Sequence, residues 1–444
     1  MISANIHDSI TAICGGRLLE RKPTSDPDGR GRRKSPDSSK NGKERPGARG
    51  SSRLAAAQQS IGTFLRATRT AQKLTQEQVA AMTRDTPWHL SRAAISAIER
   101  GQNFPGMEAM LALSNVLYVD PKELIERARL STTVPVDVTD LSLEQLGRRA
   151  ARYFWSGDFR KALSVYDAML EKLALDPPAD VGRELANLEI RRATTLKRAG
   201  ALLSAIATAE RAISLSAEIP QVHAEAYILL ADLQCQRGHL PLAGDAAKKA
   251  IELSRTLDPR TQGWAWMTEA HVRFLSADYQ QARNAFLEAR KQATAAGDEQ
   301  HLTHIDGDVG MCLLALGQVA EARTWVARAV ERARKQSQPA LEASWLVELG
   351  KIALRQRNFE EAERFASSAL RIARPREHVV TIFRAEWLQH NIARSTRPDD
   401  PDRLRIARLR KLYLHLDQHE GIEEVQVFKR TIMRKSAIEY GESR

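Results

Sequence analysis

The chain has 444 residues, of which 43% are hydrophobic and 27% are charged, so it is long enough for two or more hydrophobic cores. It has no run of ~18 uncharged apolar residues, and residues 1–16 lack the basic start, apolar block and cleavage site of an export signal, so we expect a cytoplasmic protein without a membrane segment. The formal charge of +12 favours a polyanionic partner.

Half of this charge lies in an N-terminal tail. Residues 1–54 contain 12 Lys and Arg against 6 Asp and Glu, whereas residues 55–130 contain 9 against 7. The stretch from Arg17 to Arg53 is rich in Pro, Gly, Ser and charge, with few residues to bury, so residues 1–54 are predicted to be disordered. Either the tail adds non-specific phosphate contacts, or it is a solvated leader that need not belong to the native protein; we favour the leader.

The next segment begins with two predicted helices. Ala55–Thr70 is the first, and the second follows Thr75, whose hydroxyl can accept the backbone amide of Gln78 as an N-cap. Apolar Val79 and Met82 are expected to face inward. The sequence therefore predicts two short helices that share a core.

A third helix follows, with a buried face and a polar face. Ile95 and Ile98 are three residues apart on one stripe, and Gly101 suits the end of the helix. The polar stripe consists of Arg92, Ser96 and Arg100. Met107–Leu117 and Pro121–Ala128 are predicted as helices four and five, which completes a domain over residues 55–129.

This segment resembles the helix-turn-helix domain of the Cro/phage-repressor (XRE) class of bacterial regulators, over residues 58–127 approximately. The motifs that carry the resemblance are Leu65-Arg66, Thr75-Gln76-Glu77, Ile95-Ser96-Ala97-Ile98-Glu99-Arg100-Gly101 and the stretch from Pro105 to Leu124. In that family the third helix lies in the major groove of double-stranded DNA. The resemblance implies base contacts by Arg92, Ala93, Ser96 and Ala97, and phosphate contacts by Gln76 and Arg100.

The turn between the second and third helices is longer than is usual in that family and spans Thr83–Leu90. The third helix could start early, with Thr86 as N-cap and Pro87 at its first position. Alternatively Ser91 is the cap and Pro87 lies at a loop tip. We favour the early start; the effect of the turn on docking is open.

Residues 130–140 break the helical period and are the predicted linker, after which the chain repeats itself. Gly157-Asp158-Phe159-Arg160-Lys161-Ala162 is one copy of a short sequence motif that recurs along the chain. The alanines that end successive copies are 38 to 43 residues apart. They are Ala162, Ala205, Ala243, Ala282, Ala322 and Ala362. Twelve residues before each one stands a small residue, as two closely crossing helices require.

Residues 141–376 therefore resemble a tetratricopeptide solenoid of six helix pairs with a lengthened period. Residues 377–444 are predicted to add a seventh pair, Val379–Ala393 with Arg403–Leu416, and a capping helix at Ile422–Met433. The fold class is therefore all-α: a five-helix DNA-binding domain followed by an α-solenoid.

The sequence lacks the motifs of an enzyme or a metal site. It contains no Gly-x-x-x-x-Gly-Lys-Ser/Thr, Gly-x-Ser-x-Gly, His-Glu-x-x-His or Cys-x-x-Cys, and its three cysteines fit incidental reduced thiols. His271, His304 and Asp308 could bind a metal, but we favour a polar groove lining. We expect no enzymatic activity, no cofactor and no metal.

The resemblance to tetratricopeptide proteins implies that the first helix of each pair lines a groove. The residues expected there are Arg191, Thr194, Lys197, Asp232, Gln236, Trp264, Met267, His271, Phe274, Asp308 and Met311. Trp264, Met267, His271 and Phe274 form one helical stripe. This stripe either anchors a ligand or packs against a neighbouring helix, and Trp266 on the opposite register is expected in the core.

These features predict a sequence-specific DNA-binding regulator that acts as a homodimer, with repeats that sense a peptide or protein or mediate oligomerisation. The arrangement resembles peptide-responsive regulators in which an XRE head is joined to tetratricopeptide repeats. The alternatives are a repeat scaffold with a targeting head and an antitoxin-like partner of a toxin. The operator, the effector and the sign of regulation do not follow from the sequence.

Overall fold

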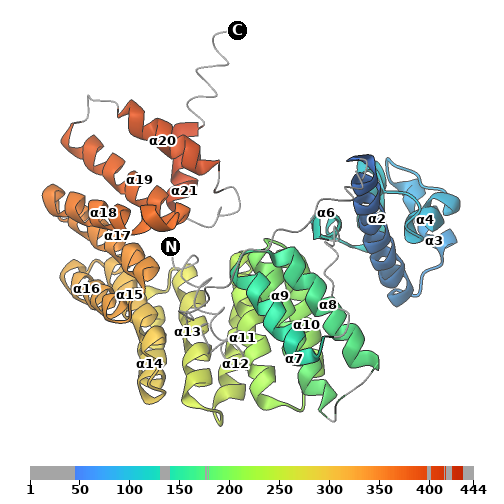
Figure 1. The fold of residues 1–444 in the computed structure, drawn as a ribbon, viewed down its shortest axis with the longest axis horizontal. Coiled ribbons are helices and arrows are strands. Elements are labelled where there is room, and N and C mark those ends of the chain that lie inside the picture. Colours follow the sequence, from blue (N-terminus) through green and yellow to red (C-terminus); the bar gives the residue numbers. More distant parts are fainter. Residues whose placement is uncertain are drawn as a thin grey trace, which may run out of the picture. The chain divides into compact units, whose positions relative to one another are not determined.

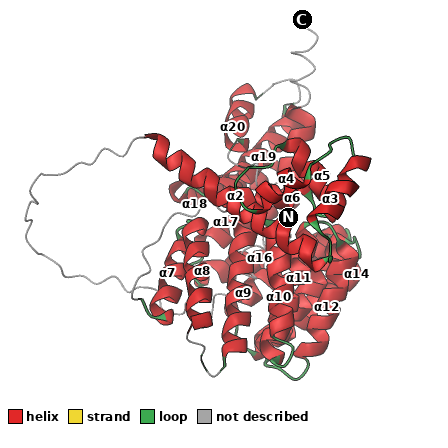
Figure 2. Ribbon diagram, turned by 90° about the vertical axis from the view of Figure 1, so that its right-hand side faces the viewer, coloured by secondary structure: helices red, strands yellow, loops and turns green. Residues whose placement is uncertain are grey.

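The computed structural model describes residues 46–130, 141–175, 178, 180–397, 402–414, 416 and 423–433. Within these ranges the regular elements are helices, without a β-strand, which confirms the all-α fold (Figures 1 and 2). Helices form two compact units, the first ending at Arg211 and the second beginning at Ala212. No helix in the described part combines the length and apolar character that crossing a membrane would need.

Residues 46–130, here called the head, contain the five predicted helices. These are α2 (Pro46–Ala71), α3 (Gln76–Met82), α4 (Arg92–Glu99), α5 (Met107–Leu117) and α6 (Pro121–Leu130), with a short 3₁₀ turn at Thr83–Asp85. The first helix begins at Pro46 rather than at Ala55, and proline suits a first helical position because its missing N–H would have no partner there. The tail predicted to be disordered, residues 1–54, is therefore helical from Pro46 onward, and the predicted linker, residues 130–140, starts one residue late because α6 includes Leu130. Residues 1–45 and 131–140 lie outside the described residues.

The head has one apolar core. Its fully buried side chains include Ile61, Leu65, Val79, Ile95, Leu113 and Leu124. Met82 was expected to face inward but is 37% exposed, and Ala80 is buried instead. The reason is that Thr83, four residues after Val79 and fully buried, takes the inward position, so Met82 lies at the edge of the buried face.

Helices α7 to α18 form the predicted succession of pairs. They are α7 (Leu143–Trp155) with α8 (Phe159–Leu175), α9 (Val181–Arg198) with α10 (Leu202–Leu215), α11 (Pro220–Gln236) with α12 (Leu240–Ser254), α13 (Pro259–Leu275) with α14 (Tyr279–Ala295), α15 (Glu299–Ala315) with α16 (Val319–Lys335), and α17 (Pro339–Arg355) with α18 (Phe359–Ala373). In the second unit these helices lie side by side in chain order, each second helix packing on the first helix of the next pair (Figure 1). This is the nearest-neighbour packing of a repeat protein.

The small residues of the repeat lie where paired helices cross. All six closing alanines are fully buried, as are the alanines twelve residues before them in the first four pairs. In the fifth pair a Cβ added to Gly310 would lie 2.5 Å from Val326 Cγ2 of α16, and in the sixth a Cβ on Gly350 would lie 3.4 Å from the Ala362 carbonyl oxygen of α18. The helices therefore approach closely because these positions carry little or no side chain.

The chain continues with α19 (Val379–Thr396), α20 (Arg403–Tyr413) and α21 (Glu423–Phe428), which ends in a π-helical segment at Lys429–Met433. This agrees with the predicted seventh pair and terminal helix. An apolar cluster joins the three helices through Phe383, Trp387, Leu409, Leu416, Val425 and Phe428.

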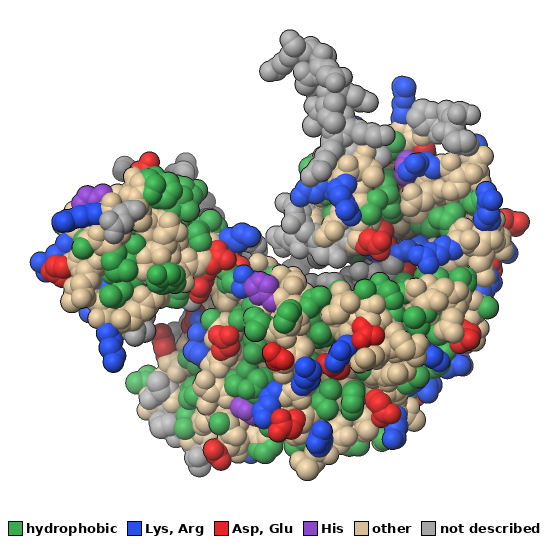
Figure 3. All heavy atoms as spheres, turned by 180° about the vertical axis from the view of Figure 1, so that it is seen from behind, with side chains coloured by type: hydrophobic (Ala, Val, Ile, Leu, Met, Phe, Trp, Pro, Cys, Tyr) green, Lys and Arg blue, Asp and Glu red, His purple; other side chains and the backbone are tan. Residues whose placement is uncertain are grey.

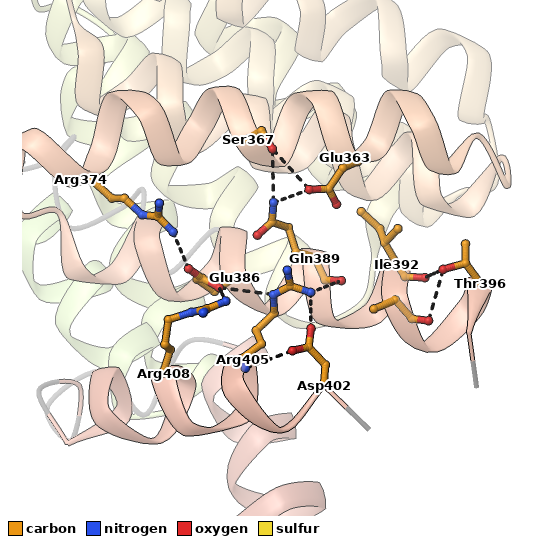
Figure 4. Close-up of polar contacts among 11 residues, drawn as sticks. Glu363, Ser367, Arg374, Glu386, Gln389, Ile392, Thr396, Asp402, Arg405 and Arg408 are labelled. Atoms are coloured by element: carbon orange, nitrogen blue, oxygen red, sulfur yellow. Dashed lines mark hydrogen bonds and ion pairs between the residues drawn. The ribbon is translucent and has the colours of Figure 1, made fainter. Parts of the chain in front are cut away.

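Beside this cluster, ion pairs hold α20 against α19 (Figure 4). The Glu386 carboxylate, 2% exposed, lies 2.7 Å from Arg374 Nη2 and 3.4 Å from both Arg405 Nε and Arg408 Nη2. Gln389, one turn later, donates to Glu363 and Ser367 of α18. One face of α19 is therefore bound to both neighbouring helices by polar contacts.

A left-handed residue ends the first helix of several pairs. Gly157, Gly200, Gly238 and Gly317 have φ between +76° and +80°, but the same position is Ala277 in the fourth pair, with φ +60°. A Cβ in this conformation costs about 1–2 kcal/mol, which glycine avoids. The repeat therefore contains strain at Ala277.

Ala277→Gly is expected to raise the free energy of unfolding by about 0.5–1 kcal/mol, because the relief of strain exceeds the greater chain entropy of glycine. The midpoint of urea unfolding measures this. The reverse variant Gly317→Ala, with no atom within 4 Å of its added Cβ, should lower the midpoint. A lower midpoint for Ala277→Gly would contradict the strain.

Candidate nucleic-acid interface and repeat groove

Helices α3 and α4 are both capped by side chains. Thr75 and Gln78 form a capping box at α3, as predicted, with Thr75 Oγ1 accepting the Gln78 amide at 3.1 Å. At α4 the cap is Ser91, whose hydroxyl accepts the Ala94 amide at 3.2 Å. Gly101 has φ +66° just after the helix, as a terminating glycine does.

The favoured early start of the third helix is wrong, because two threonines fold the long turn into a loop. Thr83 Oγ1 accepts the Leu90 amide at 3.1 Å, and Thr86 Oγ1 donates to the Thr83 carbonyl at 2.8 Å. These bonds engage the Thr86 hydroxyl inside the loop, so that it caps no helix. Pro87 consequently lies in the loop and α4 starts at Arg92.

The predicted base-facing residues lie along α4 on the side away from the core. Ile95 and Ile98 are 1% and 5% exposed, which confirms the buried stripe. The outer side carries Arg92 and Ala93, both exposed, then Ser96 and Ala97, both half-buried, and then exposed Arg100 at the C-cap. The helix thus presents a long donor at its start and small side chains behind it.

Arg92 is held by an exposed ion pair. Its Nε lies 2.7 Å from Glu77 Oε1, and the side chains of Arg92 and Glu77 are 67% and 57% exposed. Exposed pairs of this kind contribute little to stability, so a nucleic acid can compete for the guanidinium. Arg100 Nε donates to the Ser96 carbonyl at 3.3 Å.

Beneath α3 and α4 lies a buried carboxylate that the sequence reasoning missed. Glu99, 5% exposed, accepts two hydrogen bonds from Arg69 of α2, at 2.7 and 2.9 Å, and one from Gln76 Nε2, at 2.7 Å. The bond to Glu99 raises the pKa of Arg69. One amide hydrogen of Gln76 is therefore engaged, and the predicted phosphate-contact residue also positions α3.

Close backbone contact also fixes α4 on α2. A Cβ added to Gly62 would lie 2.3 Å from the Ile98 carbonyl oxygen. Only a residue without a side chain fits there, so α2 and the end of α4 touch through their backbones. Together with Glu99, this contact fixes the orientation of the outer face of α4.

The predicted groove residues fall in both units of the chain. Arg191, Thr194 and Lys197 belong to α9 of the first unit, where Thr194 and Lys197 are buried. The others lie on α11, α13 and α15 of the second: Asp232, Gln236, Trp264, Met267, His271, Phe274, Asp308 and Met311.

Much of the predicted aromatic stripe packs between α13 and α15. Trp264 is 3% exposed and stacks on His301 with 3.9 Å between ring centroids, and His301 Nε2 lies 2.9 Å from Met267 Sδ. Burial lowers the pKa of His301 well below its ordinary value. His271 Nε2 lies 3.3 Å from buried Asp308 Oδ2. These three stripe residues therefore follow the packing interpretation.

The fourth stripe residue has a different environment. Phe274 is half-buried and lines, together with Met311, a cavity of about 640 Å³ between the first helices of successive pairs and α21. Lys351, Arg384 and Trp387 are among the other lining residues. The groove described by the structure thus lies further along the chain than the sequence pattern indicated.

Neither metal ligands nor activated thiols are found in the described ranges. No group of three or more His, Cys, Asp or Glu side chains there could hold a metal ion. Cys235 and Cys312 are buried, and burial raises the pKa of Cys235 to about 12, so its thiol stays protonated near neutral pH. Cys14 lies outside the described residues.

The family model described as Helix-turn-helix matches residues 65–124, and the model described as Tetratricopeptide repeat matches residues 302–374. The chain therefore contains a helix-turn-helix domain of the XRE type and tetratricopeptide repeats. The first match covers α3 and α4, and the second runs from α15 to the end of α18. No curated protein sequence is significantly similar to this chain.

Several solved structures are similar to this chain at low sequence identity and with TM-scores below 0.5. PlcR of Bacillus thuringiensis, in complex with the peptide PapR7 and DNA, is 13% identical, with a TM-score of 0.38, over 72% of this chain and 96% of that one. Aspartyl phosphate phosphatase F of Bacillus subtilis is 14% identical, with a TM-score of 0.47, over 90% and 92%. A Rap protein complexed with competence and sporulation factor is 13% identical, with a TM-score of 0.45, over 83% and 100%.

One face of the molecule shows a mixture of charges. Basic and acidic side chains are interspersed on the face drawn in Figure 3. This agrees with the modest excess of Lys and Arg over Asp and Glu after residue 54. A contact with DNA therefore depends on where individual donors lie rather than on a uniformly basic surface.

Glu99→Gln is expected to lower the free energy of unfolding of the helix-turn-helix domain by about 1.5–3 kcal/mol, because hydrogen bonds to the charged acceptor are lost while the shape is kept. Calorimetric melting of the full chain measures this. The matched control Glu77→Gln removes an exposed pair and should change stability by no more than about 0.5 kcal/mol. Equal effects of the two variants would show that the buried network does not hold the domain.

Proposed function

We propose that this protein is a sequence-specific, DNA-binding transcriptional regulator whose repeats sense a peptide or protein segment or mediate oligomerisation. The observation that supports the first half is the outer face of α4. Its apolar stripe is buried and its N-terminus is fixed by Ser91, so Arg92, Ala93 and Ser96 project together from a rigid helix. That is the arrangement with which helix-turn-helix proteins read the major groove.

The surroundings of α4 support the same role. Glu99, Arg69 and Gln76 fix α3 and α4 on α2 at hydrogen-bond distances of 2.7 to 2.9 Å. Base recognition requires such fixed geometry, since a bidentate contact tolerates little displacement. Gln76 and Arg100, at the start of α3 and the end of α4, are proposed to contact phosphates.

The decisive experiment is selection of bound DNA from a random pool with the full chain. Recovery of a defined sequence supports the regulator. The alternatives, a repeat scaffold with a targeting head and an antitoxin-like module, predict no enriched sequence or an effect exerted on a protein partner. A footprint on the promoter of its own gene would likewise favour the regulator over the two alternatives.

Arg92 is expected to contact a guanine edge, because it is the long donor at the N-terminus of α4. Arg92→Ala should weaken binding to the selected site by about 1–3 kcal/mol and relax one position of it. Competition binding against single-base variants measures both effects. The control Lys122→Ala removes an exposed charge from α6 and should keep the base preference. A uniform loss on all sequences would make Arg92 a phosphate contact.

We further expect a homodimer, because one head contacts too few base pairs for genomic specificity. The selected DNA should then contain two half-sites about one helical turn apart. Light scattering of the full chain, free and bound to that DNA, tests the stoichiometry. A single copy in both states would contradict the dimer.

A further inference from the structure

The cavity beside α21 lies on what we call the first-helix face, the surface lined by α11, α13, α15, α17 and α19. It has a volume of about 640 Å³ and one of its walls is α21 itself. Phe274, Tyr279 and Trp387 supply aromatic surface, and Arg355 and Asn391 supply polar groups. It is therefore a mixed apolar and polar site, as ligand pockets are, rather than a purely apolar gap.

A cluster of four charges lies next to this cavity. Arg384, 2% exposed, contacts Glu348 of α17 through Nη2 and lies 3.2 Å from Glu424 Oε1 of α21 through Nε. Lys351 Nζ lies 3.4 Å from Glu348 and 3.0 Å from Glu424. Two cations from the first-helix face thus share two carboxylates, one of which belongs to α21.

The electrostatics of the cluster depend on Glu424. Burial alone would raise the pKa of Glu424, but Arg384 and Lys351 lower it far below its ordinary value. Burial alone would likewise lower the pKa of Arg384, and the two glutamates raise it. Without Glu424, the buried Arg384 would keep the Glu348 carboxylate and the Ser344 hydroxyl but lose one of its two carboxylate partners. A buried cation that loses its partner is strongly unfavourable, so the site requires a carboxylate from whatever covers it.

Helix α21 meets this requirement with few residues. It is six residues long, and its buried side chains are Glu424, Val425 and Phe428. Phe428 packs edge-on against Phe383 and Trp387 of α19, with centroid distances of 5.5 and 5.8 Å. Glu423 and Gln426 are exposed. The buried side chains of α21 are therefore one acidic residue and two apolar residues, one and four positions after it.

We propose that this part of the first-helix face is a binding site for an external peptide segment with the same pattern, and that α21 is its built-in competitor. The incoming segment replaces the Glu424 carboxylate with its own, so the charge balance around Arg384 and Lys351 is preserved. This inference rests on the proposed sensing role of the repeats and gives the chemistry of the effector.

The neighbouring cavity gives such a segment a place to bind first. The exposed Arg355 lines it and has no carboxylate partner among the described residues, its Nη1 donating to the Leu314 carbonyl at 3.4 Å. A second acidic group on the segment would be attracted there. Phe274, the half-buried member of the predicted stripe, lies on the same wall.

The test uses a fluorescein-labelled peptide with the sequence of residues 421–433 and measures its anisotropy with the full chain. A tethered competitor acts at an effective concentration in the millimolar range. The double variant Glu424→Gln, Phe428→Ala, which weakens the attached α21, should therefore bind the peptide at least tenfold more tightly than the unaltered chain. Arg384→Met in that background should abolish binding, as should Glu424→Gln in the peptide.

Absence of binding to a double variant that still melts cooperatively would overturn the proposal and leave α21 as a structural end cap. So would a doubling of mass without peptide binding, because α21 of a second copy would then be the occupant. Where the double variant does not fold, hydrogen exchange of residues 423–428 in the unaltered chain decides. Excess peptide should speed that exchange, and unchanged exchange contradicts displacement.

The assay contains no DNA, so its outcome is separate from that of the proposed function. A chain that selects a DNA sequence but fails to bind the peptide keeps its role as a regulator and loses this site. A chain that binds the peptide but selects no DNA keeps the site and loses the regulator.

Discussion

The repeat domain depends on the close crossing of two helices in each pair. Where the chain places Gly310 against the backbone of Ala322, there is no side-chain volume to hold the helices apart. The larger apolar side chains then pack around the crossing and between neighbouring pairs. Because each pair contacts mainly the next one, the face formed by the first helices is built up one pair at a time.

At both proposed functional sites, the outer face of α4 and the site beside α21, buried charged side chains rather than apolar packing fix how the helices are arranged. In the head, Glu99 joins Arg69 and Gln76 from two other helices. At the far end, Arg384 joins Glu348 and Glu424 from two others. Such pairs add little net stability compared with apolar residues of the same shape, but they are costly to break on one side only. They therefore favour one packing arrangement of the helices over arrangements in which a helix is slightly shifted or rotated.

The fold followed from local sequence rules, because each helix has its own start, stop and apolar stripe. The Thr75 cap, the Ile95 and Ile98 stripe and the buried alanines of the repeat were predictable from spacing alone. The start of α4 was not, since it depends on hydrogen bonds of Thr83 across the turn to Leu90. The suitability of Pro87 for a first helical position says nothing about the hydrogen bond between Thr83 and Leu90.

The candidate sites could be predicted only in part, because their side chains meet partners from helices that are distant in sequence. Periodicity identifies which residues of α13 share a stripe, but not what lies opposite. His301 of α15 stacks on Trp264, and α21 covers the cluster near Phe274 only because a helix more than a hundred residues later returns to this face. Glu99 and Glu424 were missed for the same reason: an acidic residue has no periodic signature, and its partners are distant in sequence.

The loop held by Thr83 and Thr86 affects how DNA recognition by this protein can be compared with that of other helix-turn-helix proteins. Because α3 ends at Met82 and α4 begins only at Arg92, counting from the end of α3 as for a short turn would assign base contacts to residues of the loop. A recognition code transferred from domains with a short turn would be out of register by more than one helical turn. Alignment of such codes to this chain has to begin at Ser91, the residue that caps the helix.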